Sequence, residues 1–422
     1  MHERATLANG IRILTARMPW VRSVSIAYFF GVGSRYEAAD ESGVSHFIEH
    51  MLFKGSERYP TAQAISETIE GVGGVLDAAT DKELTVYSAK IASVHFELAM
   101  GLLADMVRHP RLEEAEMEKE RRVIVEEIGM YRDSPQEWVG VLGDETFWPN
   151  NLPLGREVAG TRETVEGIGR ARLRDYYASH YVPGNLVLSV VGNVEHGAVV
   201  EAAERLLGDW APRETPTWTP CPPPLETRRV RLESRRTEQT NLCLYTLGLP
   251  HRDADYYASV LLNAVLGDGM ASRLFLNVRE REGLAYDVSS APMHYHDTGA
   301  FIVYAGEDPK RVDAALRAIL AELARLRDEP VTAAELRRVK EYTKGRMALR
   351  LEDTHSVASW LGGQEALLRE VRELDETLAR IEAVTIEDVQ RLARRLFADE
   401  WLRLAVIGPQ KDAKALERLL RL

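Results

Sequence analysis

The sequence predicts an α+β protein of two similar domains, each with an antiparallel-rich mixed sheet and helices packed mainly on one face. Two observations lead to this prediction: a weak internal repeat, and a proline-rich stretch near the middle of the 422 residues. A chain of this length exceeds one ordinary hydrophobic core, so two or more domains are expected. Its 45% hydrophobic and 28% charged residues are typical of a globular protein.

The internal repeat links the two halves of the chain. Residues 185–192 form an apolar run that ends in glycine and leads into an amphipathic segment, and residues 401–408 repeat this pattern near the end of the sequence. In the same way, the charged stretch at residues 114–127 is echoed at residues 333–346. Each pair predicts the same sequence of elements used twice, which indicates two homologous domains.

The boundary between these domains is expected at the proline-rich stretch. Proline lacks a backbone N–H and cannot continue a helix or a central strand, so residues from Pro212 to Pro224 predict a semi-rigid linker. We therefore expect an N-terminal domain at residues 1–211, a linker at residues 212–226 and a homologous C-terminal domain at residues 227–422.

Composition excludes several classes of protein. The net charge of −12 argues against a nucleic-acid surface or a polybasic membrane patch. Only Cys221 and Cys243 occur, so no disulfide framework is indicated. Residues 1–5 do not begin a secretory signal, and no apolar run approaches the ~20 residues that span a bilayer. We expect a cytoplasmic protein that binds neither nucleic acid nor membrane.

One short segment gives the clearest chemical signal. Residues 46–50 read His-Phe-Ile-Glu-His, the reverse of the His-Glu-x-x-His order found on zinc-protease helices. On a helix, His46 and His50 lie one turn apart on one face and can bind the same metal ion, and Glu49 projects from nearly the same side. Because two histidines on a helix are usually ordinary core or surface residues, a metal site requires a third ligand.

Candidates for the third ligand lie in the charged stretch from Leu112 to Tyr131, which is predicted to be helical. Glu120 and Glu127 are two turns apart and share a face of this helix. Glu126 points away from that face by about 100° of helix rotation. Taken alone, the stretch is typical of a solvated acidic helix.

Together these features resemble the inverted-zincin metallopeptidases, the family of pitrilysin, insulin-degrading enzyme and the mitochondrial processing peptidase. The resemblance rests on the segment at residues 46–50, on its distance along the chain from Glu127 and on the Glu120/Glu127 pair. Residues 7–12 resemble the family's opening strand, residues 152–156 its segment after the ligand helix, and residues 181–186 the entry to the last strand of its first domain. The similarity covers almost the whole chain, as for a short two-domain bacterial-type member.

The resemblance implies that His46, His50 and Glu127 bind zinc and that Glu49 is the catalytic base. Glu120 is implied to orient one of the ligands without touching the metal. In the second half, the counterpart of the metal helix at residues 258–265 contains no histidine, so one Zn2+ per chain is expected.

The second half offers a different pair, Arg279 and Tyr286. On its own, this pair is typical of a capped helix end with an edge aromatic, but its spacing resembles the pair with which the family's second domain completes the active site. Substrate is expected to pair with an edge strand that includes Ala78, Ala79 and Thr80. The family commonly has asparagine where Asp77 stands, so the role of Asp77 is open.

The function implied is a zinc-dependent endopeptidase that cleaves unfolded peptides and oligopeptides inside a dimeric chamber, by Glu-assisted attack of a zinc-bound water. A homodimer is expected, because this chain has both the zinc motif and the Arg/Tyr pair. A heterodimer with a related chain that lacks the zinc motif stays open. Alternatives are a presequence-type processing peptidase, a zinc subunit that needs a partner chain, and a non-enzymatic structural or peptide-holding subunit.

Overall fold

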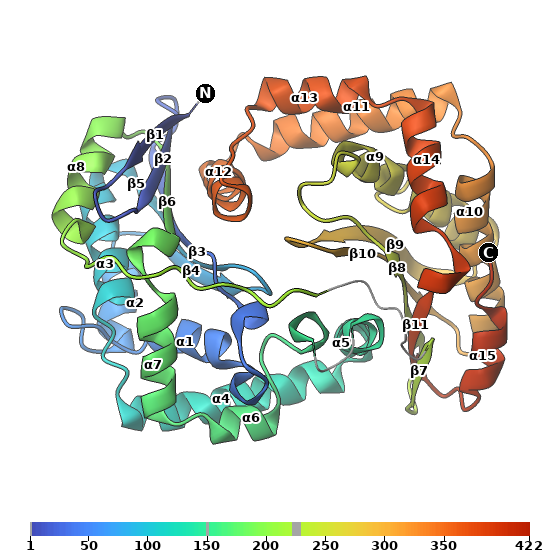
Figure 1. Ribbon diagram of the computed structural model, residues 1–422, viewed down its shortest axis with the longest axis horizontal. Helices are drawn as coiled ribbons and strands as arrows, with labels where there is room; N and C mark the ends of the chain where they lie inside the picture. Colours follow the sequence, from blue (N-terminus) through green and yellow to red (C-terminus); the bar gives the residue numbers. More distant parts are fainter. Residues whose placement is uncertain (1, 149–151, 222–228) are drawn as a thin grey trace. The chain divides into compact units, whose positions relative to one another are not determined.

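The computed structural model describes residues 2–148, 152–221 and 229–422, and it divides into two compact units. Unit 1 consists of Met1–Ile128, Glu157–Thr219 and Ala348–Glu373. Unit 2 consists of Gly129–Arg156, Pro220–Met347 and Leu374–Leu422. Each unit contains one sheet with helices on both of its faces (Figure 1).

Unit 1 is built on a six-stranded sheet in the order β1-β2-β6-β3-β5-β4. Its strands are β1 Glu3–Thr6, β2 Arg12–Arg17, β3 Ser23–Phe30, β4 Val75–Thr80, β5 Thr85–Ala92 and β6 Leu186–Gly192. Strands β2 and β6 are parallel and the other neighbours are antiparallel. The central strands are buried on both faces, whereas β4 lies at an edge of the sheet and pairs with β5 alone among its strands.

One face of this sheet holds the main core of unit 1. The helices that contribute to it are α1 Val44–Leu52, α2 Ala62–Glu70, α3 Phe96–Arg108, α4 Glu114–Asp133, α6 Arg162–Gly167, α7 Arg170–His180 and α8 His196–Leu207. Apolar side chains recur on one side of these helices at the helical period, which is the pattern that packs against a sheet. The metal motif lies on α1, so the fold fixes it against the main core of unit 1.

The opposite face of the sheet is covered by α12, Thr354–Leu368. Ala358 and Leu361 of α12 pack against Phe29 of β3, among other apolar side chains. Glu365 of this helix is fully buried, and its Oε1 accepts hydrogen bonds from Arg12 Nη1 at 3.1 Å and Arg4 Nη2 at 2.8 Å. A buried carboxylate is stable only when paired in this way, so the two arginines fix the position of α12 on the sheet.

Unit 2 has a five-stranded sheet in the order β7-β11-β8-β10-β9. Its strands are β7 Val230–Ser234, β8 Thr240–Leu247, β9 Ala285–His294, β10 Gly299–Glu307 and β11 Arg403–Gly408. Strands β7 and β11 are parallel and the others pair antiparallel. This order repeats that of β2-β6-β3-β5-β4 in unit 1, which agrees with the internal repeat in the sequence.

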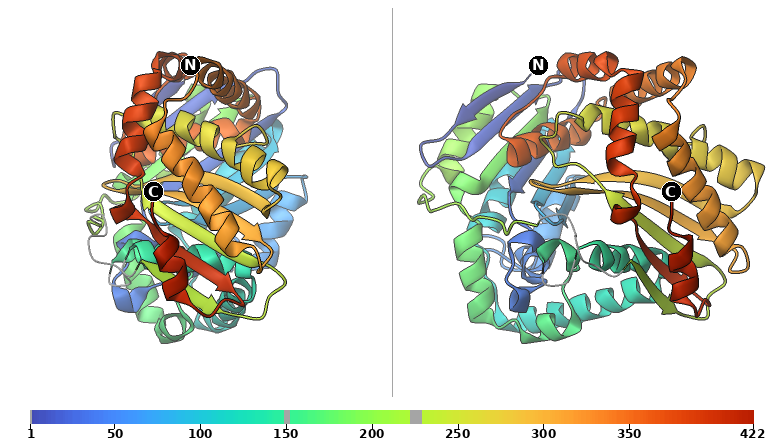
Figure 2. Two further views of the ribbon diagram at one scale, coloured as in Figure 1. Left: turned by 90° about the vertical axis from the view of Figure 1, so that its right-hand side faces the viewer. Right: turned by 45° about the vertical axis from the view of Figure 1, so that its right-hand side comes forward.

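Helices cover one face of this second sheet and α5 covers the other (Figure 2). The helices of unit 2 are α5 Pro135–Phe147, α9 Tyr256–Leu266, α10 Val312–Asp328, α11 Ala333–Arg350, α13 Leu374–Ala383, α14 Ile386–Leu396 and α15 Ala413–Leu419, together with a π-helix at Phe275–Arg281. The last residues of α11 belong to unit 1, as the last residues of α4 belong to unit 2.

The predicted fold class is confirmed: both sheets are mixed and mainly antiparallel, with most helices on one face. Each unit also takes one helix from the other half of the chain, because α5 covers the sheet of unit 2 and α12 covers the sheet of unit 1. The units therefore differ from a single division at the proline-rich stretch. Residues 222–226 of the expected linker lie outside the described residues.

The opening strand expected at residues 7–12 is wrong. The structure places Leu7–Ile11 in the turn between β1 and β2, where the Leu7 N–H donates to Ile11 O at 2.9 Å and the Gly10 N–H donates to Leu7 O at 2.9 Å. Gly10 has a φ of 93°, which glycine adopts without the penalty that a side chain brings. Asn9-Gly10 is a strong hairpin signal, and it outweighs the apolar residues around it.

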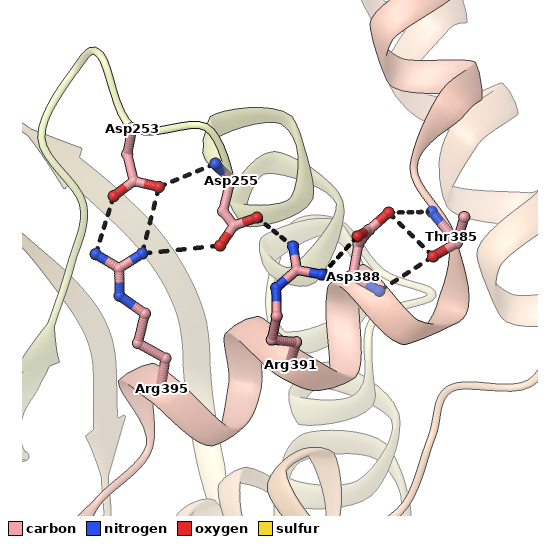
Figure 3. A network of polar contacts seen from close by, with 6 residues as sticks. All are labelled: Asp253, Asp255, Thr385, Asp388, Arg391 and Arg395. Atoms are coloured by element: carbon pink, nitrogen blue, oxygen red, sulfur yellow. Dashed lines mark hydrogen bonds and ion pairs between the residues drawn. The ribbon is translucent and has the colours of Figure 1, made fainter.

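A network of ion pairs on unit 2 joins α14 to the loop before α9. Figure 3 shows its members: Asp253, Asp255, Thr385, Asp388, Arg391 and Arg395. Arg395 Nη2 lies 2.9 Å from Asp253 Oδ2, and Arg391 Nη2 lies 2.5 Å from Asp255 Oδ1. Both arginines are about half exposed, so each pair contributes little on its own and the network acts mainly to orient the loop. None of the helices in the described part of the chain is both long and apolar enough to cross a membrane.

Candidate metal centre

Helix α1 is fixed at its first turn by a buried glutamate. Glu37 Oε2 accepts the N–H of Gly43 at 2.9 Å and Oε1 accepts the N–H of Ser45 at 2.8 Å, so both oxygens satisfy amides at the start of the helix. Gly43 has a φ of 95°, and a side chain there would collide with the carbonyl of Ala159. The helix therefore begins at a defined residue and in a defined direction.

The apolar residues of α1 then decide which side chains face outward. Val44, Phe47, Ile48, Met51 and Leu52 are all buried in the core of unit 1. This leaves His46, Glu49 and His50 on the remaining face, where each is partly exposed. The motif is therefore carried by a rigid element rather than by a mobile loop.

Helix α4 brings Glu127 to the two histidines. Glu127 Oε2 lies 3.8 Å from His46 Nε2 and 3.5 Å from His50 Nε2. The imidazole rings of His46 and His50 are 4.6 Å apart at their centroids and inclined by 71°. Across residues 2–148, 152–221 and 229–422, these three side chains form the one group of histidine, cysteine and acidic ligand atoms close enough to hold a metal ion.

This arrangement fits zinc. Zinc binds nitrogen and carboxylate oxygen at about 2.0 to 2.2 Å, so neighbouring ligands of a tetrahedral site lie roughly 3.4 Å apart. The separations of 3.5 and 3.8 Å from Glu127 are close to that value, and each histidine directs Nε2 at the shared point. Three protein ligands would leave a fourth position for water or substrate, as catalytic zinc sites require.

Glu120 orients His50 from behind. Its Oε2 accepts a hydrogen bond from His50 Nδ1 at 3.1 Å, so Nε2 is left free to face the metal position. Glu120 is nearly buried, in contrast to the exposed Glu126, which lies on another side of α4. In the described part of the protein, the buried Nδ1 of His46 has no hydrogen-bond partner.

The charges in this cluster favour a cation. Burial raises the pKa of Glu49, an effect that the Thr80 side chain and the charge on His50 oppose. Burial acts to lower the pKa of His50, but hydrogen bonds to Glu120 and Glu127 outweigh it and raise the value to about 9. Burial and the charge on His50 lower the pKa of His46 to about 4. The carboxylates of Glu120 and Glu127 therefore stabilise a positive charge on His50. A metal ion bound at this position would supply that charge in place of the proton.

The predicted substrate strand lies beside the base. Strand β4 packs against α1, and within it Ala78, Ala79 and Thr80 pair only with β5, opposite Tyr87, Val86 and Thr85. The other edge of β4 carries no strand of this sheet. The carboxylate of Asp77 accepts the N–H of Ala78 at 2.9 Å.

In unit 2 the structure brings Arg279 and Tyr286 together. The Arg279 guanidinium lies 4.7 Å from the centre of the Phe275 ring and 5.6 Å from that of Tyr286, so it is held by two aromatic faces. Arg279 lies on the π-helix, a rare conformation often found at functional sites. Tyr286 is 74% exposed, so its hydroxyl is open to a ligand. That this pair completes the zinc site stays a prediction.

Lys54 is a residue of this site that the sequence did not predict. Its Nζ lies 2.8 Å from Glu120 Oε1, on the oxygen that His50 does not use. The signal was available, because Lys54 stands four residues after His50 and just beyond the end of α1. Its partner lies on another helix, however, and spacing along one segment does not reveal such a contact.

Comparison with known sequences identifies the family. Residues 12–162 match the model of the insulinase family, peptidase family M16, and residues 167–342 match the model described as the peptidase M16 inactive domain. A Bacillus subtilis (strain 168) protein described as an uncharacterized zinc protease, YmxG, is 38% identical over 97% of this chain and 98% of its own length. An uncharacterized zinc protease of Streptomyces coelicolor is 38% identical over 98% of this chain and 90% of its own.

Solved structures share the fold. The crystal structure of a protease from Helicobacter pylori covers 97% of this chain and 100% of its own, with 22% identity and a TM-score of 0.90. A structure from Pseudomonas fluorescens, described as a peptidase M16 inactive domain, covers 97% of this chain and 98% of its own, with 20% identity and a TM-score of 0.89. From its family models, its relatives and its fold, this chain belongs to peptidase family M16, the insulinase family.

Proposed function

We propose that the chain is a zinc-dependent endopeptidase that cleaves unfolded peptides, with His46, His50 and Glu127 as the ligands of one zinc ion. The observation that carries the proposal is the convergence of these three side chains, on two helices, with Glu49 on the same face of α1. Zinc bound there would supply Lewis acidity, which acidifies water and polarises a peptide carbonyl.

Glu49 acts as the base in this proposal. It stands one residue before His50, so its carboxylate lies beside the metal position and can accept a proton from the attacking water. The same carboxylate can then give the proton to the amine that leaves when the peptide bond breaks. Glu120 takes no part in proton transfer and instead holds His50 in the ring orientation that binds metal.

Substrate binding is assigned to the free edge of β4. An extended peptide that pairs with Ala78, Ala79 and Thr80 would form main-chain hydrogen bonds and pass next to Glu49. Main-chain pairing requires an extended backbone and reads little of the side chains, which favours unfolded peptides over folded proteins. Arg279 and Tyr286 are proposed to contribute donors to substrate oxygens and to the oxyanion.

We further propose that two copies of the chain form the working enzyme. The resemblance to larger members of the family implies an enclosure of four such domains, and one chain supplies two. Sedimentation velocity of the purified protein tests this, and a monomer that is fully active would contradict it.

The test of the function is cleavage of a quenched fluorescent peptide library by wild type and Glu49→Gln, with bound zinc counted in both. We expect wild type to cut and Glu49→Gln to keep its zinc while activity falls by orders of magnitude, because the variant retains all three ligands but cannot accept the proton. If Glu49→Gln remains as active as wild type, the assignment of the base is wrong.

A matched pair of variants on α4 tests the metal site itself. Glu127→Gln should lose most of the bound zinc, because it removes a charged ligand. Glu126→Gln makes the same chemical change one residue away on an exposed side of the helix, and it should keep both zinc and activity. Equal zinc content in the two variants would exclude Glu127 as a ligand.

A further inference from the structure

A lysine forms the end of a chain of contacts that leads to the metal position. Lys54 Nζ lies 2.8 Å from Glu120 Oε1, and the other oxygen of the same carboxylate lies 3.1 Å from His50 Nδ1. The Nε2 of His50 in turn lies 3.5 Å from Glu127 Oε2. Glu120 and His50 therefore each contact one neighbour through one atom and the next neighbour through another atom.

The contact differs from an ordinary surface ion pair in its burial. The side chain of Glu120 is 8% exposed and that of Lys54 is 26% exposed, so solvent screens the pair only in part. The carboxylate of Glu120 is held at both oxygens, one by Lys54 and one by His50. Held at a single oxygen, a carboxylate can rotate, and the ring that it orients can rotate with it.

The position of Lys54 in the fold supports a specific role. Lys54 follows the last turn of α1, and its backbone N–H donates to Met51 O at 3.1 Å, so its position is tied to the helix that carries His50. Glu120 and Glu127 both come from α4. Lys54 therefore links the helix of the histidines to the helix of the glutamates on the side away from the metal position.

We propose that Lys54 is a positioning residue of the metal centre, which fixes the carboxylate of Glu120 so that His50 presents Nε2 to the metal. This inference rests on the proposed zinc site and names a residue that the site needs beyond its ligands. Lys54 touches neither metal nor substrate and acts only through Glu120.

Two effects of the lysine oppose each other, and this makes the proposal testable. A positive charge near a metal cation weakens binding by repulsion, so removal of the charge alone would tighten binding of zinc. Removal of the lysine also frees Glu120 and His50 to rotate, and this would weaken zinc binding. The direction of the change in zinc affinity for Lys54→Met therefore shows which effect dominates.

The experiment measures the dissociation constant of zinc for the full-length protein by competition with a chromophoric chelator. We expect Lys54→Met to bind zinc about tenfold more weakly than wild type, the lower end of the range for residues that orient a ligand, which corresponds to about 1.4 kcal/mol. Lys54→Arg keeps the charge and the donors and should restore most of the affinity. Lys119→Met is the matched control, because it removes an exposed lysine next to Glu120 in sequence that pairs with Glu116 instead.

A double-mutant cycle separates positioning from a general loss of structure. In the background of Glu120→Ala, Lys54→Met should weaken zinc binding no further, since its partner is already gone. Thermal unfolding of the metal-free proteins identifies any variant that does not fold, and Lys54→Gln then replaces Lys54→Met. Unchanged or tighter zinc binding by folded Lys54→Met would overturn the inference and leave the zinc peptidase intact. Absence of zinc binding by wild type would overturn both.

Discussion

A buried acid at the end of β10 makes the stability of unit 2 depend on pH. Glu307 is 1% exposed, and within the described structure neither of its carboxylate oxygens has a hydrogen-bond partner. Burial raises the pKa of Glu307 from 4.5 to about 9, because an unpaired carboxylate is costly to keep away from water. At neutral pH the folded protein therefore keeps a proton on Glu307 that the unfolded chain has released.

The sign and size of the effect follow from this difference. The stability that the neutral form provides is complete below pH 4.5 and is lost as the pH rises towards 9, at up to about 1.4 kcal/mol per pH unit. Between pH 5 and pH 8 the upper bound on the loss is therefore about 4 kcal/mol. Glu307→Gln keeps the shape of the side chain but has no proton to lose, so its unfolding free energy should not show this slope.

The assay is urea unfolding of metal-free wild type, Glu307→Gln and Glu417→Gln at four pH values from 5 to 8. Glu417 is an exposed acid on α15 of the same unit, so Glu417→Gln controls for the loss of one acid. The difference in unfolding free energy between Glu307→Gln and wild type should grow as the pH rises. If the two curves run parallel over this range, Glu307 does not carry a proton in the folded protein and the reasoning is refuted.

Two further predictions concern the buried ion pair of α12 in unit 1 and the hydroxyl of Tyr286 in unit 2. Glu365→Ala leaves the buried Arg12 without its carboxylate, so we expect a loss of about 3 to 5 kcal/mol in the free energy of urea unfolding. We expect a much smaller change for Glu373→Ala, whose pair with His2 is partly exposed. A loss below about 1 kcal/mol would show that the pair does not hold α12. Tyr286→Phe should lower kcat/KM for peptide cleavage by about 100-fold with zinc affinity unchanged, because only the hydroxyl is removed. Full activity of that variant would exclude the hydroxyl from the reaction.

The metal motif was predictable because its geometry is local. The positions of His46, Glu49 and His50 on one face follow from the helical period alone, and the buried residues between them indicate which face is free. Glu127 is different, because the packing of α4 against α1 depends on the whole core of unit 1. Periodicity could show only that Glu120 and Glu127 share a face, and the resemblance to a family supplied the rest.

Features that depend on contacts between distant segments were not predictable. Nothing in the residues of α12 or α5 indicates which sheet each helix covers, since an apolar helix surface fits either. The π-helix that holds Arg279 is likewise a product of its surroundings, as its residues are compatible with an ordinary α-helix. The turn at Asn9 and Gly10 is the opposite case, because its signal is local and stands in the sequence itself.

The reciprocal placement of α5 and α12 bears on how the protein is made. Three separate segments of the chain belong to unit 1. The helix α12, which covers the sheet face opposite the main core, lies in the last of them, Ala348–Glu373. At a synthesis rate of about 5 to 20 residues per second, the ribosome needs roughly 9 to 35 s to pass from Gly192, the end of β6, to Leu368, the end of α12. Throughout that interval the apolar surface around Phe29 and Val187 lacks the helix that packs on it in the folded protein. That apolar surface therefore stays exposed to solvent until α12 leaves the ribosome.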